Sequence, residues 1–117
     1  MSQENVEIVR AAIDTFNRGD VDAALKDVSR GAFNFEQFRR LLTAFTDSWE
    51  SVTLGADELI DAGEDVVMPF TNVSRGRDGI EVQARGVWVW TIRDGPIVRV
   101  CLYQERQEAL EAAGLSE

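Results

Sequence analysis

The sequence offers few side chains that could transfer a proton. None of its 117 residues is histidine, which is both the commonest general base and the commonest transition-metal ligand in proteins. Proton chemistry would therefore depend on a carboxylate such as Glu105 or on the phenol of Tyr103. Glu105 follows the last apolar run of strand type, where it could be an acid with a raised pKa or simply a negative charge at the start of a helix.

A second candidate group is aromatic and lies in GVWVWTIRDGPIVRV, residues 86–100. Trp88 and Trp90 are two positions apart, so a strand would point both rings toward the same face. That face could belong to a packed core, to a contact with a partner chain or to a small-molecule pocket. The alternating pattern alone leaves these possibilities open.

The first fifty residues predict three helices, each with apolar residues three or four positions apart. Gly19 is suited to end the first helix, and Asp20 can cap the short second one. The third helix is predicted to begin after Asn34 in FNFEQF, which is typical of a capped N-terminus. The predicted apolar stripes are Val6, Val9, Ile13 and Phe16, then Val21, Ala24, Leu25 and Val28, and finally Phe35, Phe38, Leu42, Phe45 and Trp49.

From Ser51 onward the apolar residues alternate with a period of two, which indicates strands joined by tight turns. Pro69 cannot donate to a strand ladder and predicts an edge or a bulge, while Gly86 predicts a bend. The order predicts an α+β fold with three N-terminal helices on one face of an antiparallel sheet, in a single domain spanning residues 1–117. The predicted strands cover residues 51–62, 64–76, 78–95 and 96–104, and a short helix follows in residues 105–117.

The composition excludes several classes of function. With a net charge of -9, the chain is not expected to bind nucleic acid, and no apolar run is long enough to span a bilayer. The start, MSQENVEIVR, lacks the features of a signal or transit peptide, and the single cysteine, Cys101, permits no internal disulfide, so we expect a cytoplasmic protein. The acidic segment DELIDAGED does not match a calcium-binding loop, and we expect neither a metal nor a cofactor.

Four segments resemble the SnoaL-like branch of the nuclear transport factor 2-like superfamily, which also contains ketosteroid isomerase. They are ENVEIVRAAIDTFNRGDVDAAL at the start, DELIDAGEDVV in the middle, VWTIRDGPIVRV in the hairpin and EALEAAGL near the end. The resemblance implies a strongly curved, conical sheet wrapped around the helices, with a pocket inside the cone. It also implies a homodimer formed through the outer face of the sheet.

The sequence departs from that family where its members have polar pocket residues. Trp88 stands where many relatives have a histidine, and Leu102 stands where SnoaL-like proteins often have a glutamate. The seven residues Lys26 to Ala32 are too few for the family's first strand, which carries the general base in ketosteroid isomerase. The resemblance thus implies an apolar pocket, either open or filled by the two tryptophans, with the ligand-binding candidates Phe16, Trp49, Trp88, Trp90 and Leu102.

Three functions are consistent with these residues. The first is a small dimer that binds an apolar small molecule without catalysis, because aromatic residues replace the acid–base groups. The second is a cyclase, isomerase or hydratase that uses Glu105 or Tyr103, which requires these side chains to face the inside of the cone. The third is an assembly module in which a second chain covers the sheet edge left by the missing strand.

Overall fold

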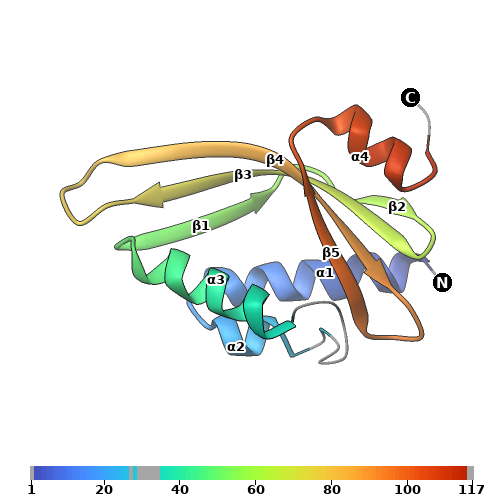
Figure 1. Ribbon diagram of the computed structural model, residues 1–117, viewed down its shortest axis with the longest axis horizontal. Helices are drawn as coiled ribbons and strands as arrows, with labels where there is room; N and C mark the ends of the chain where they lie inside the picture. The colour runs from blue at the N-terminus through green and yellow to red at the C-terminus, as the bar shows by residue number, and fades with distance from the viewer. Residues whose placement is uncertain (1, 27, 29–34, 116–117) are drawn as a thin grey trace.

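The computed structural model describes residues 2–26, 28 and 35–115, and it confirms the predicted α+β order (Figure 1). The predicted cap at Asn34 and most of the segment from Lys26 to Ala32 lie outside the described residues. None of the helices within the described residues is long and apolar enough to cross a membrane. The elements are α1 (Ser2–Asn17), α2 (Val21–Ala24), α3 (Phe35–Asp47), β1 (Ser51–Ala56), β2 (Ile60–Ala62), β3 (Asp65–Arg75), β4 (Glu81–Ile92), β5 (Ile97–Tyr103) and α4 (Arg106–Ala112).

Helix α1 packs against the sheet and is hydrogen-bonded to β1 at its C-terminus. Val6, Val9 and Ile13 of its apolar stripe are buried, Val9 completely, whereas Phe16 is half-buried. At its C-terminus, the Asn17 side chain donates to the Leu54 carbonyl and accepts from the Leu54 amide, both over 2.8 Å. The Asn17 amide therefore takes the place of a neighbouring strand along the outer edge of β1. Gly19 then reverses the chain with a φ of 90°, and Asp20 caps α2 through the Ala23 amide, as predicted.

The strands form a curved antiparallel sheet in the order β1-β3-β4-β5, and β2 pairs with the first residues of β3. The predicted first strand, residues 51–62, is therefore two strands, separated at residues 57–59. Pro69 is not on an edge strand, because β3 is paired on both sides, but the pairing is irregular at Pro69: residues 57–59 lie between the pair of Ala56 with Phe70 and the pair of Ile60 with Val67. Pro69 is tolerated there because its carbonyl accepts from the Asp57 amide at the break between β1 and β2, and its nitrogen, which has no hydrogen, faces the same break.

The two faces of the sheet carry separate apolar clusters. The inner face bears Trp88 and Trp90 and packs against the three N-terminal helices. The outer face bears Val87 and Val89, which α4 covers with Ala109 and Leu110. Val87 and Val89 thus point outward as the strand pattern predicts, but this chain's own last helix buries them.

An ion pair fastens α4 to the connection between β1 and β2. Arg106 donates to both carboxylate oxygens of Glu58, over 2.8 and 3.4 Å. These hydrogen bonds, followed by the charge of Arg106, lower the pKa of the Glu58 carboxyl. The contact therefore stabilises the fold at neutral pH, and its contribution disappears as the pH falls through the lowered pKa.

Of residues 27–34, the structure describes only Val28. This residue forms an isolated parallel bridge with Ile97, at the start of β5. Within the described residues, this single bridge stands at the position where the family resemblance implies a complete first strand.

Gly86 allows the aromatic side chains of the inner face to pack closely. A Cβ atom at this position would lie 3.0 Å from two ring carbons of Phe70 and 3.3 Å from a methyl group of Leu102. We expect Gly86→Ala to lower the free energy of unfolding by about 1–3 kcal/mol, because the buried Phe70 ring has little room to move. Urea denaturation measures this loss.

Gly55→Ala is the matched control on β1, because its nearest neighbour, the Thr71 carbonyl oxygen, would be 3.4 Å away. An equal loss of stability in both variants would show that Gly86 has no special packing role.

Candidate functional site

Trp88 is the centre of an aromatic cluster on the inner face, which we define as Phe38, Phe70, Trp88 and Trp90. Its ring centroid lies 6.1 Å from that of Phe38 on α3, in an edge-to-face arrangement, and 6.0 Å from that of Phe70 on β3. Trp90, two residues along β4, is 6.2 Å away. These spacings are within the favourable range for aromatic pairs. One helix and two strands therefore supply a continuous aromatic surface.

The cluster extends from the core toward the solvent. Trp90 is 6% exposed and belongs to the main apolar core, whereas Trp88 is only half-buried. Leu102 is the strand partner of Trp88 on β5, shares its face and is 57% exposed. The structure thus brings together three of the five ligand-binding candidates, with Trp90 deepest and Leu102 at the rim.

The indole nitrogen of Trp90 is buried without a hydrogen-bond partner among the described residues. An unsatisfied donor of this kind costs about 1–3 kcal/mol and is uncommon in native interiors. An acceptor oxygen that reached this nitrogen would recover part of that cost.

The other two ligand-binding candidates lie apart from the cluster. Trp49 follows α3 and packs its ring 6.3 Å from that of Phe45. It lines a shallow hollow of about 490 Å³ with residues at the tip of the β3–β4 hairpin, including Ile80 and Val82. Phe16 is half-buried near the end of α1 and has no ring contact within the described residues.

The two candidate catalytic residues lie away from the aromatic cluster. Tyr103 is the strand partner of Val87 and packs with the outer-face cluster beneath α4. Glu105 is the exposed N-cap residue of α4, and its side chain makes no capping hydrogen bond. Ser74 is the only polar residue in the buried part of the described chain. The cluster can therefore stack against an apolar molecule, but no described carboxylate is buried beside it.

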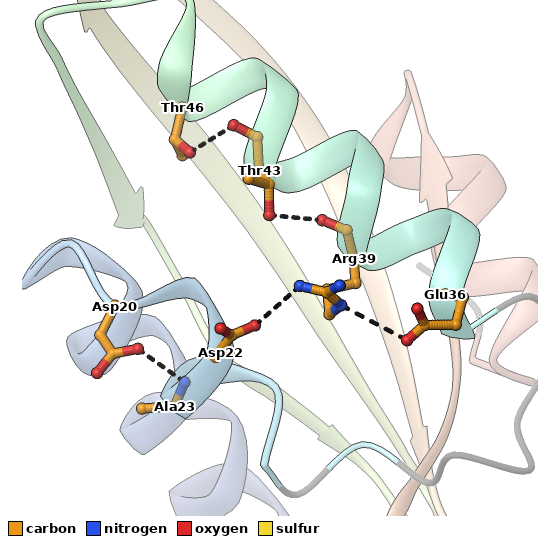
Figure 2. Close-up of polar contacts among 7 residues, drawn as sticks. All are labelled: Asp20, Asp22, Ala23, Glu36, Arg39, Thr43 and Thr46. Atoms are coloured by element: carbon orange, nitrogen blue, oxygen red, sulfur yellow. Dashed lines mark hydrogen bonds and ion pairs between the residues drawn. The ribbon is translucent and has the colours of Figure 1, made fainter.

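A second concavity was not anticipated from the sequence. It is a cleft of about 600 Å³ between α2 and α3. Arg39 lines it and forms ion pairs with Asp22 over 3.2 Å and with Glu36 over 3.5 Å (Figure 2). Among the described residues, the apolar part of its lining comprises the buried residues Leu25, Val28 and Phe35. Because these three side chains belong to the same core as Trp90, the cleft reaches that core from the helical side.

Of the features that the sequence did not single out, only Phe70 had a recognisable local signal. Phe38 was assigned to the buried stripe of α3, but nothing in its spacing showed that it contacts Trp88. Phe70 follows Pro69 and lies opposite Gly86, so a small residue facing a large one was the available signal. The cleft depends on how α2 and α3 approach each other, which no local pattern specifies.

The sequence matches no protein-family model and no curated protein. Its fold is nevertheless shared with solved structures. AclR from Streptomyces galilaeus, proposed to be a hydroxylase, has a TM-score of 0.80 at 14% identity, covering 97% of this chain and 87% of AclR. SalBIII, an epoxide hydrolase/cyclase-like enzyme in pyran ring formation in the polyether salinomycin, has a TM-score of 0.74 at 19% identity, covering 89% and 92%.

An NTF2-like protein of unknown function from Burkholderia pseudomallei has a TM-score of 0.68 at 19% identity, with 92% of this chain and 95% of that chain covered. The chain therefore has the nuclear transport factor 2-like fold. This result confirms the fold that the sequence resemblance implied.

The two tryptophans of the cluster are expected to differ in their contribution to stability. Trp90→Ala should lower the free energy of unfolding by about 3–5 kcal/mol, because it leaves a cavity in the core. Trp88→Ala should cost clearly less, since that ring is partly solvated already. Urea denaturation of both variants tests this difference, and equal losses would place Trp88 in the rigid core.

Proposed function

We propose that this chain is a SnoaL-like protein that binds a small apolar molecule against the aromatic cluster and does not catalyse a reaction on it. The observation that carries the proposal is the half-buried Trp88 beside the exposed Leu102, with Phe38 and Phe70 against the same ring. Exposed aromatic and aliphatic surface on the inside of a curved sheet is suited to an apolar ligand. Trp90 adds a donor that an oxygen-bearing ligand could use.

The alternative of a cyclase, isomerase or hydratase receives less support from the geometry. Such a reaction needs an acid or base within hydrogen-bond reach of the substrate. Tyr103 is on the outer face and Glu105 is at the start of α4, so neither lies beside Trp88. AclR and SalBIII share only 14% and 19% identity with this chain, so their enzymatic character does not support a reaction here.

The homodimer and the cytoplasmic location are parts of the same proposal. A free Cys101 is compatible with a reducing compartment. On the outer face, α4 covers Val87 and Val89. The rest of that face, formed by β1 and by the halves of β3 and β4 that lie beside it, is left for a partner chain. Thr53 and Gln83 lie in that remaining part.

The binding site can be tested with N-phenyl-1-naphthylamine, an uncharged apolar probe whose fluorescence rises on binding. We expect saturable binding to the wild-type protein and about tenfold weaker binding to Trp88→Leu, because the variant loses the central ring of the cluster. Native mass spectrometry of freshly purified protein would reveal a co-purified small molecule independently.

Trp49→Leu is the matched control, since Trp49 is also half-buried but packs against Phe45 at the other end of α3. It should bind the probe as the wild-type protein does. Equal weakening by both substitutions, or wild-type protein that binds neither the probe nor a co-purified molecule, would contradict the proposed site.

A further inference from the structure

Strand β4 has an open edge along half of its length. It contains 12 residues, whereas β5 contains 7 and pairs only with the segment from Val87 to Ile92. The remaining segment, Glu81 to Gly86, pairs with β3 on one side and with no described strand on the other. Figure 1 shows the β3–β4 hairpin extending as an arm beyond β5 and α4. All residues from Glu81 to Arg85 are exposed.

The open edge lacks several of the features that prevent strand pairing. It contains no proline and no lysine, and the irregularity in the pairing of β4 lies at the other end, between Thr91 and Ile92. Its two charged residues, Glu81 and Arg85, have opposite signs and stand four positions apart on the outer face. A second copy of the same edge would therefore meet complementary charges.

We propose that two copies of this chain associate by antiparallel pairing of their β4 edges, with Gln83 facing Gln83 across a two-fold axis perpendicular to the sheet. In this register Glu81 of each copy lies opposite Arg85 of the other, and Val82 lies opposite Ala84. The two arms then form one continuous sheet, with the outer faces of both copies on the same side. This interface is distinct from the outer-face dimer and does not depend on ligand binding.

The charges favour this register over its neighbours. Directly opposed residues in antiparallel strands have Cβ atoms about 4.5–5.5 Å apart, which is within reach of an ion pair. Glu81 already binds Arg75 of its own chain over 2.7 Å, so it would lie between two arginines in an alternating row. Arg85 has no ion-pair partner within the described residues. Centring the pairing on Val82 or Ala84 would place Arg85 opposite Gly79 or Gln83 and leave its charge unpaired.

The same register covers exposed apolar side chains that the single chain leaves in solvent. Val82 is 46% exposed on the inner face and would meet Ala84 of the second copy. Tyr103 already lies opposite Val87 on this side of β4, so the pairing extends only from Glu81 to Arg85.

A charge exchange tests the register. We expect sedimentation velocity over a concentration series to show a reversible edge-paired dimer once the outer-face contact is blocked by Thr53→Arg. Arg85→Glu should raise the dimer dissociation constant about tenfold, because two attractive cross-strand pairs become repulsive. The double variant Glu81→Arg with Arg85→Glu should restore the dimer dissociation constant to near its original value, since each exchanged side chain again faces one of opposite charge. Arg77→Glu, at the hairpin tip, makes the same charge change outside the pairing and should have no effect.

Thr53→Arg separates this interface from the outer-face dimer, because Thr53 is exposed on that face at the far side of β3. In the Thr53→Arg background the outer-face contact is blocked, so the dimer that remains should be the edge-paired one and should respond to Arg85→Glu and to the charge exchange as described above. A Thr53→Arg protein that stays monomeric at all concentrations would overturn the proposal. A Thr53→Arg dimer that resists Arg85→Glu, or that is not restored by the charge exchange, would also overturn it.

Discussion

The unequal lengths of β4 and β5 determine how the rest of the structure is organised. Where β5 pairs with β4, from Val87 to Ile92, the sheet is covered on both faces, by α4 outside and by the N-terminal helices inside. Burial on both faces provides most of the apolar contact on which a small domain depends. Beyond Gly86 the sheet continues as an exposed arm. The aromatic cluster lies at the boundary between these two halves.

Position at that boundary explains why two neighbouring tryptophans of one strand have different environments. Trp90 lies in the half of the sheet that helices cover on both faces, and it contributes to the core. Trp88 is two residues closer to the arm and stays half-buried. Gly86 is the next residue on the same face, and its lack of a side chain allows Phe70 and Leu102 to approach each other. A larger residue there would separate the aromatic surface from its aliphatic rim.

The periodic parts of the fold could be predicted from the sequence. The helices α1 and α3, the hairpin turn at Asp94 and Gly95, and the shared face of Trp88 and Trp90 follow from spacing and turn chemistry. The predicted stripe of α3 is only partly correct, because Phe35 is buried whereas Phe45 is 37% exposed. The interior position of Pro69 could not be predicted, because it depends on a break between β1 and β2 in a different part of the chain. The separation of Trp49 from the cluster depends likewise on the axis of α3, which a helical stripe does not specify.

The family resemblance and the alternating pattern of β4 led to different expectations about what covers the outer face of the sheet. The resemblance implied a partner chain there, whereas the alternation of β4 specified only which residues point outward. The structure shows that α4 covers Val87 and Val89, so the most apolar part of that face is satisfied within one chain. Among the described residues, the large apolar side chains that remain exposed are Leu41 and Phe45 on α3, and Ile80, Val82 and Leu102 along the unpaired edge and the inner face. The position of Val82 favours association through the strand edge, because that contact removes from water apolar surface that folding of one chain leaves exposed.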